Sequence, residues 1–214
     1  MLVEEGWQIN RKRTQRLWRE EGLRVPRRVR KRRRLGESAV AARRLRAERP
    51  GQVWALNFLQ DQTADGHALR LLNIVDEYTR EALEMHVDRS ITADEVVTVL
   101  ERLAAKRGAP AYLRCDNGSE LAAHALRDWC RFTATSTSYI DLRSPWQNAL
   151  VESFNGRVRD ELLNVEEFSC LAEARVVFGD WHEDYNTRRP HSALGMRTPV
   201  AFAAPCAARS PAAA

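Results

Sequence analysis

Long apolar runs and paired cysteines are both missing from this 214-residue sequence. No apolar stretch approaches the roughly 20 residues that a membrane-spanning helix needs, and Glu4 and Glu5 follow Met1 where a signal peptide would be basic. The four cysteines are scattered without a C-x-x-C pair, so their spacing supports neither a disulfide framework nor a zinc site. These absences predict a soluble, intracellular protein with reduced thiols and no membrane partner.

Acidic residues are scarce in the first 50 positions, which hold 17 Lys and Arg against 6 Glu and therefore carry a net charge of +11. The remaining 164 residues hold 17 basic and 23 acidic residues, a net charge of −6. A basic arm on a mildly acidic globule predicts a polyanionic partner that meets the arm first, and the planar guanidinium of arginine suits bidentate contact with phosphate. From composition alone, a solvated arginine-rich tail is an equally good interpretation.

The basic first part of the chain divides into a short helix, a charged run and a connector. Asn10 can cap a helix over residues 11–21, which Gly22 would end. The narrow apolar stripe of this helix needs a partner, as in the last part of a helix-turn-helix. The run over residues 27–34 follows, and an alanine-rich connector reaches Pro50–Gly51. The expected divisions are a partial helix-turn-helix (1–26), a basic arm and linker (27–50), a folded core (51–204) and a disordered tail (205–214).

Beyond Gly51 the apolar pattern changes to a period of two and to residues that favour strands. The first three predicted strands form a meander with a turn at Asp65–Gly66, and helices alternate with strands after it. The capping box Thr92-x-x-Glu95 begins the first of these helices. Predicted strands cover 53–60, 68–75, 82–87, 112–115 and 136–140, and predicted helices cover 92–107, 121–131, 148–163 and 171–185. Together they predict an α/β domain with a mixed five-stranded sheet.

Two carboxylates have positions that suit metal binding. Asp116 directly follows a predicted strand, where α/β sheets expose ligands, and Glu152 lies one turn into a predicted helix, with 35 residues between the two. The polar face of that helix, which we expect to be open, consists of Asn148, Glu152, Asn155 and Arg159. Carboxylates brought together from a strand end and a helix are what hard divalent cations require. Taken singly, each of the two is more often an ordinary surface acid.

Several short motifs occur in the order typical of one family. They are Trp54-x-x-Asn57-Phe58, Asp116-Asn117-Gly118-x-Glu120, Ser144-Pro145-x-x-Asn148-x-x-x-Glu152-Ser153-Phe154-Asn155 and Tyr185-Asn186-x-x-Arg189-Pro190-His191-Ser192. Over residues 5–203 the sequence resembles the integrase core of bacterial insertion-sequence transposases, in particular the second reading frame of the "IS-three" family, which is related to retroviral integrases. Each motif alone is weak, and their agreement in order makes the resemblance specific.

The resemblance implies an RNase H-like fold and DNA integration by two-metal phosphoryl transfer. In this family three acids hold two Mg²⁺ or Mn²⁺ ions while element ends are nicked and joined to target DNA. The second and third acids fall on Asp116 and Glu152, whereas the first falls on Asn57, whose neutral amide leaves only two anionic ligands. Asp61 cannot replace it, because four residues along a strand span about 13 Å. Asp76 is interpreted as a turn residue.

Position 57 separates two hypotheses. The first is a transposase-type DNA recombinase impaired by Asn57, and the second is a catalytically silent DNA-binding protein that regulates related active transposases. An RNase H-like hydrolase of another kind is a third interpretation, against which the C-terminal motif argues. The implied partners are DNA, further copies of the chain on that DNA, and the product of an upstream reading frame, in the bacterial cytoplasm. The residues expected to contact DNA are Arg27, Arg28, Arg30, Lys31, Arg32, Arg33, Arg34, Asn148, Asn155 and Arg159.

The C-terminal motif offers a second candidate surface. Trp181, Tyr185, Arg188, Arg189 and His191 could together stack on bases and contact phosphate. Trp181 and Tyr185, at helical spacing, are more often core residues. The sequence leaves both interpretations open.

Overall fold

The structure is a computed structural model that describes residues 10–21, 46–115, 124–139 and 149–207. The chain forms two compact units, Met1–Ala42 and Arg43–Ala214, and each is described by itself. Within the described ranges, no helix combines the length and the apolar character needed to cross a membrane. The basic run over residues 27–34 lies outside the described residues, so its predicted role and the predicted domain boundaries stay predictions.

The described part of the first unit is one helix, α1 (Arg11–Glu20). The side chain of Asn10 accepts a hydrogen bond from the backbone N–H of Lys12 at 2.9 Å, which confirms the predicted cap. Leu17 and Trp18 are 43% and 53% exposed, so the apolar stripe is uncovered by the described residues of this unit. The helix-turn-helix stays a prediction.

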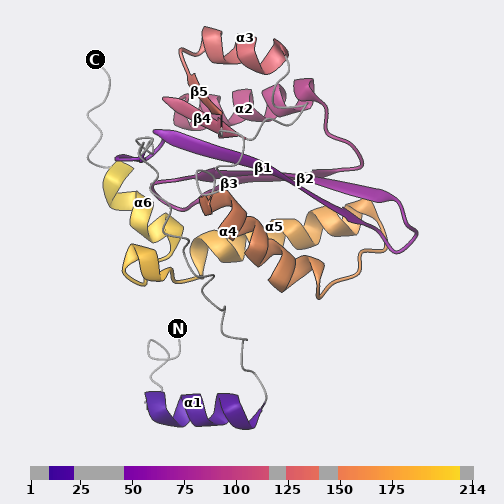
Figure 1. The fold of residues 1–214 in the computed structure, drawn as a ribbon, viewed down its shortest axis with the longest axis vertical. Helices are drawn as coiled ribbons and strands as arrows, with labels where there is room; N and C mark the ends of the chain where they lie inside the picture. The colour runs from indigo at the N-terminus through magenta and orange to yellow at the C-terminus, as the bar shows by residue number, and fades with distance from the viewer. Residues whose placement is uncertain (1–9, 22–45, 116–123, 140–148, 208–214) are drawn as a thin grey trace, which may run out of the picture. The chain divides into compact units, whose positions relative to one another are not determined.

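The second unit is built on a mixed five-stranded sheet, as the period-two pattern predicts (Figure 1). The strands are β1 (Val53–Gln62), β2 (Ala68–Asp76), β3 (Ala82–Asp88), β4 (Tyr112–Cys115) and β5 (Ser136–Tyr139). They lie in the order β3-β2-β1-β4-β5, with antiparallel pairing through the meander β1–β2–β3. On the other edge of β1, β4 and β5 join in parallel. All five predicted strands are confirmed, with ends shifted by at most two residues.

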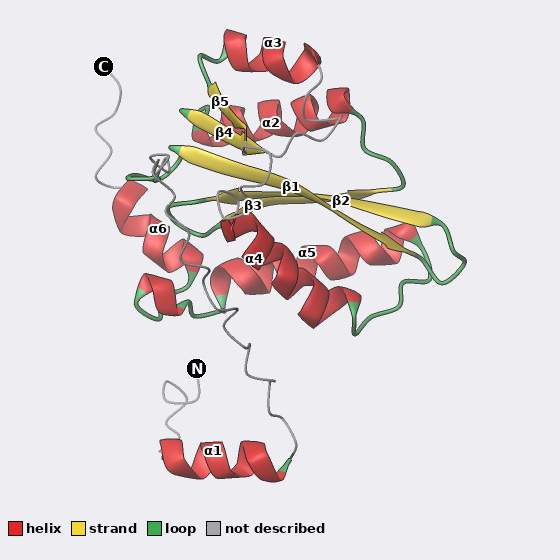
Figure 2. Ribbon diagram, in the orientation of Figure 1, coloured by secondary structure: helices red, strands yellow, loops and turns green. Residues whose placement is uncertain are grey.

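Helices cover both faces of this sheet (Figure 2). Alternate residues of a strand point to opposite faces. Trp54 and Leu56 of β1 therefore pack with α2 (Ala93–Arg107) and α3 (His124–Phe132), whereas Ala55 and Leu59 pack on the opposite face. Each face thus has its own apolar core, and β1 contributes to both.

The first helix after the meander, α2, begins and ends where the sequence predicts. The Thr92 side chain accepts a hydrogen bond from the backbone N–H of Glu95, and the Glu95 carboxylate accepts one from the Thr92 N–H at 2.6 Å. Gly108 ends the helix with φ +80°, a conformation that costs glycine little. The predicted capping box is confirmed.

The second face of the sheet is covered by α4 (Ala149–Val158) and α5 (Leu171–Thr187). The sequence predicts one uninterrupted α-helix to residue 163, but the last turn, η2 (Arg159–Leu163), is π-helical. Such turns hold an extra residue and occur often at functional sites. The hydrophobic pattern does not reveal this change, because Leu162 still packs in the core.

The predicted disordered tail is wrong at its start. Helix α6 (Pro199–Ala207) continues through Pro205, because alanine favours helix and Pro199 suits the first helical position. The Phe202 ring also packs against Tyr78, with centroids 5.8 Å apart, and the Arg197 guanidinium lies over it. These contacts anchor the helix to the second unit.

Candidate active site

Asn57 lies in the middle of the central strand, on the face that α4 covers. Its neighbours Ala55 and Leu59 belong to the core cluster of that face, so the alternation of β1 places Asn57 there as well. The Asn57 side chain is half-buried, whereas Ala55 and Leu59 are buried. In the antiparallel register with β2, Asn57 stands directly opposite Asn73. The register of the sheet and the alternation of β1 therefore hold Asn57 under α4.

Asn73 and Asn155 form a buried amide pair that ties α4 to the sheet. Asn73 Nδ2 donates a hydrogen bond to Asn155 Oδ1 at 2.8 Å, and the two residues are 0% and 5% exposed. The side-chain oxygen of Asn73 has no hydrogen-bond partner among the described residues. The prediction that Asn155 lies open and contacts DNA is wrong, because α4 packs closely on β1 and β2 and a buried amide there must pair with another polar group.

Glu152 lies on the first turn of α4 with its side chain exposed. It precedes Asn155 by three residues, and side chains at that helical spacing are neighbours, with Cβ atoms about 5–6 Å apart. Asn155 in turn bonds to Asn73, which stands opposite Asn57. None of the ion pairs between described residues includes Glu152. Its carboxylate therefore extends from the exposed side of α4 without a described cation to neutralise it.

Asp116 lies outside the described residues, so its approach to Glu152 stays a prediction. The residue before it, Cys115, ends β4, which pairs in parallel with the strand of Asn57. Among the described residues, no three His, Cys, Asp or Glu side chains form a group that could hold a metal ion. The described site residues supply one amide and one carboxylate.

The other residues predicted to contact DNA are divided between the described and undescribed ranges. Arg159 is exposed in the π-helical turn η2, directly after α4, and its contact with DNA stays a prediction. Asn148 and the basic run over residues 27–34 lie outside the described residues.

Two further aspartates, Asp61 and Asp76, lie on β1 and β2. Asp61 lies in β1 four residues past Asn57, about 13 Å along a strand, so the two side chains are well apart. Asp76 is 4% exposed, and its carboxylate accepts hydrogen bonds from the backbone N–H groups of Gly51, Tyr78 and Thr79 at 2.6, 2.7 and 3.1 Å. Burial raises the pKa of Asp76, and these hydrogen bonds oppose the shift. The predicted turn role of Asp76 is confirmed.

The C-terminal motif packs into the core of the α4 face. Tyr185 is 4% exposed, and Trp181 stacks on it with ring centroids 5.2 Å apart and 23° between the ring planes. Arg189 forms a bidentate ion pair with Glu161 of η2. The core interpretation of Trp181 and Tyr185 is therefore confirmed.

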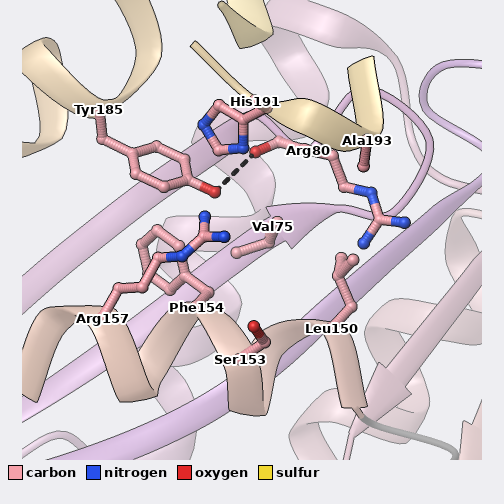
Figure 3. A pocket seen from close by; sticks show the side chains of 9 residues that line it. All are labelled: Val75, Arg80, Leu150, Ser153, Phe154, Arg157, Tyr185, His191 and Ala193. Atoms are coloured by element: carbon pink, nitrogen blue, oxygen red, sulfur yellow. Dashed lines mark hydrogen bonds between the residues drawn. The ribbon is translucent and has the colours of Figure 1, made fainter. Parts of the chain in front are cut away.

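Sequence reasoning missed a small cavity beside this motif. Arg80, from the turn between β2 and β3, and Arg157, from α4, line it together with Tyr185 and His191 (Figure 3). These residues are widely separated in the sequence, and no local pattern joins them. Only the C-terminal motif itself pointed to this part of the protein.

Comparison with known protein families identifies the class to which this fold belongs. Two families described as integrase core domain match residues 47–145 and 133–199. Solved structures have the same fold. One is a chain of the simian T-cell lymphotropic virus intasome in complex with PP2A regulatory subunit B56 gamma, which matches with a TM-score of 0.61 and 17% sequence identity. The match covers 79% of this chain and 58% of that chain. The HTLV-2 integrase catalytic core domain in complex with magnesium matches with a TM-score of 0.58 and 16% sequence identity, over 73% of this chain and 99% of that chain. The protein belongs to the integrase-core class, with an RNase H-like fold.

Full-length relatives define the family further. An insertion element IS407 protein of Burkholderia multivorans is 41% identical over 95% of this chain and 73% of its own length. An insertion element IS476 protein of Xanthomonas euvesicatoria is 38% identical over the same share of this chain, which spans only 58% of that relative. A putative transposase of element IS150 from Escherichia coli is 25% identical over 94% of this chain and 74% of its own length. The chain is a member of the transposase family of bacterial insertion sequences, which confirms the predicted resemblance.

Proposed function

We propose that this protein recombines DNA as a transposase, nicking the ends of an insertion element and joining them to target DNA by phosphoryl transfer. The observation that carries the proposal is the placement of Asn57 and Glu152 on β1 and α4, two elements that pack on each other and are tied by the Asn73–Asn155 pair. Asp116 follows β4, the parallel neighbour of β1. Asn57, Glu152 and Asp116, the three residues that match the family's acids, thus lie on or directly follow elements that adjoin one another in the fold.

Two Mg²⁺ or Mn²⁺ ions are the proposed cofactors, held by Asp116, Glu152 and Asn57. Carboxylate and amide oxygens suit hard divalent cations, but Asn57 brings no charge, so this donor set has one negative charge fewer than the family motif. Such ions, when bound, stabilise the charge that develops on the attacking and leaving oxygens. The chain itself supplies position: the amide pair between β2 and α4 fixes the distance of the Glu152 turn from the sheet.

DNA affinity is proposed to come from basic residues outside this centre. The run over residues 27–34 holds seven Lys and Arg, which supply a sequence-independent attraction to phosphates, and the exposed Arg159 adds a cation next to α4. The proposed partners also include further copies of the chain on the same DNA and the product of an upstream reading frame. The proposed location is the bacterial cytoplasm.

Asn57 is proposed to impair catalysis in this chain. Losing one preorganised catalytic group typically lowers a rate by about a hundred- to ten-thousand-fold, whereas DNA binding depends on residues elsewhere. The same residue favours a second candidate function, a silent DNA-binding protein that regulates related active transposases, because binding needs no third carboxylate.

Strand cleavage of a labelled terminal-repeat duplex tests both candidates. The unaltered chain, Asn57→Asp, and a control combining Asn57→Asp with Glu152→Gln would be compared in the presence of Mg²⁺ or Mn²⁺. The upstream reading-frame product would be supplied for end recognition. We expect Asn57→Asp alone to cleave, about a hundredfold or more above the other two, while all three bind the duplex equally. Equal and robust cleavage by the unaltered chain would contradict the role assigned to Asn57. No cleavage by any of them, with binding intact, would favour the regulator.

A further inference from the structure

A cavity of about 70 Å³ lies on the side of α4 that turns away from Glu152. Ser153 and Arg157 of α4 line it from one side, and Tyr185 and His191 line it from another, with Arg80 across from Arg157 (Figure 3). One buried water needs roughly 10–15 Å³ of such volume, so the cavity has room for several waters or one small tetrahedral anion. On a helix of 3.6 residues per turn, Arg157 and Glu152 project in different directions, so the cavity is separate from the candidate metal centre.

The charge that lines this cavity is positive, and Arg157 has no carboxylate partner among the described residues. Arg189, Arg114 and Arg107 each pair with a glutamate, but none of the ion pairs between described residues includes Arg157. Arg80 lines the cavity beside it. A guanidinium that faces a cavity without a carboxylate is suited to receive an anion.

The pKa shifts of His191 and Tyr185, two titratable residues that line the cavity, are both influenced by this positive charge. Burial lowers the pKa of His191 to about 4, and the charges of Arg157, Arg189 and Arg80 lower it further. Burial raises the pKa of Tyr185, while the same three arginines oppose that shift. Three guanidinium groups therefore act on one small volume, which disfavours a cation there and favours an anion.

His191 also presents an unused polar atom. The residue is 7% exposed, and its Nε2 has no hydrogen-bond partner among the described residues. Buried polar atoms without a partner are rare in folded proteins, and a missing ligand is a common cause. The ring is held in place, because it packs edge-on against Tyr185 with centroids 4.9 Å apart, and the His191 backbone pairs with that of Arg197. The pocket is therefore preformed.

A second cavity, of about 490 Å³, adjoins the first. It shares Arg80, Leu150 and Ala193 with the smaller cavity and adds Arg46 to its lining. Among the described residues that line it, Glu77 is the one acid, and it forms an ion pair with Arg114. A ligand longer than one anionic group, such as a nucleic-acid strand, could therefore continue from the small cavity into the larger one without meeting an unpaired carboxylate.

We propose that the cavity between Arg80, Arg157 and His191 binds one phosphate group. The phosphate belongs either to a DNA backbone, in which case this contact rests on the proposed function, or to free inorganic phosphate. Arg80 and Arg157 contact its oxygens from two sides, and His191 Nε2 gains its missing partner. Phosphate bound here holds a strand against the flank of α4 that is opposite Glu152.

Thermal unfolding of the full chain in inorganic phosphate is the first test. At about ten times the dissociation constant, phosphate should raise Tm by roughly 2–5 °C relative to potassium chloride of equal ionic strength. Arg157→Gln should remove this rise. Arg131→Gln, which neutralises an exposed arginine on α3 across the sheet, should keep it. In the unaltered chain, phosphate should also shift the imidazole NMR signals of His191, a readout that needs no variant.

Duplex binding as a function of salt identifies the source of the phosphate. Loss of one phosphate contact should lower the log–log salt slope by about 0.9 in Arg157→Gln and leave it unchanged in Arg131→Gln. A phosphate effect together with this change supports the pocket with DNA as its ligand, and a phosphate effect without it supports free phosphate. If phosphate neither raises Tm beyond chloride nor shifts the His191 signals, the proposal is overturned. None of these readouts needs strand cleavage, so a silent metal centre would leave them intact.

Discussion

The two faces of the central sheet are built from alternate residues of the same strands, yet they are filled differently. Toward α2 and α3, the middle of β1 and β2 contributes only apolar side chains, namely Trp54, Leu56, Leu72 and Ile74. Toward α4 and α5, each strand places an amide between apolar neighbours: Asn57 lies between Ala55 and Leu59, and Asn73 lies between Leu71 and Val75. The amides stand opposite each other, so the polar interruption occurs at one level of the sheet.

The difference indicates which face of the sheet contributes more to folding stability. An apolar side chain contributes folding free energy in proportion to its buried area, whereas a buried amide must recover its desolvation cost through hydrogen bonds. On the α4 face this recovery is incomplete, because the Asn73 side-chain oxygen has no partner among the described residues. The α2 face therefore supports the fold, and the α4 face gives up some stability to carry a polar site.

Leu56→Ala should give the largest effect on stability. Leu56 is 0% exposed, and truncating such a residue costs about 2–5 kcal/mol of unfolding free energy. Asn57→Asp, one position along the same strand, should cost about 1 kcal/mol or less, because the side chain is half-buried. Urea unfolding followed by tryptophan fluorescence measures both. Comparable losses of unfolding free energy from the two substitutions would show that the two faces do not differ in their contribution to stability.

Acidification should destabilise the α4 face through His191. Its folded-state pKa is lowered from 6.5 to about 4, so the unfolded chain takes up this proton first as the pH falls. The stabilisation from the neutral imidazole is complete above about pH 6.5 and is lost as the pH falls toward 4, by as much as about 3 kcal/mol. Unfolding free energies of the unaltered chain and His191→Gln, measured from pH 7 to 4, should converge by this amount. Parallel curves would show that His191 titrates normally.

An effect smaller than that of Leu56→Ala is expected from the amide pair. Asn155→Ala should cost about 1–3 kcal/mol, because it leaves the buried Asn73 side chain without any partner. Replacing both residues by leucine should cost less than the sum of the single replacements, since no unpaired amide then remains. A double-mutant cycle in urea measures this coupling. Additive costs would mean that the amides do not hold α4 to the sheet as a unit.

Local rules in the sequence predicted most of the fold. Thr92 with Glu95 and Gly108 mark both ends of α2, and the period-two pattern located every strand, because these signals act within a few residues. The failures arise from contacts distant in sequence. The burial of Asn155 depends on Asn73, 82 residues away, and the path of α6 through Pro205 depends on the contact of Phe202 with Tyr78.

The candidate site was predicted only in part, because some of its residues come together through contacts between distant parts of the sequence. Family motifs led to Asn57 and Glu152, which the structure places on packed elements. The phosphate pocket draws Arg80, Arg157 and His191 from three separate segments. Of the three, only His191 stands in a sequence motif. No local pattern marks Arg80 or Arg157, so the packing of α4 against the C-terminal motif is what brings them to His191.

The alternation of β1 also limits how chains of this fold can change in length during evolution. Gaining or losing one residue between Trp54 and Asn57 would turn every later side chain of the strand to the opposite face. An apolar residue would then occupy the place of Asn57, and the amide would enter the core beneath α2. The turn between β1 and β2 is exposed, with Gly66 at φ +81°, and can take extra residues without moving either face. Insertions are therefore tolerated at this hairpin tip, while the spacing that precedes Asn57 is fixed by geometry.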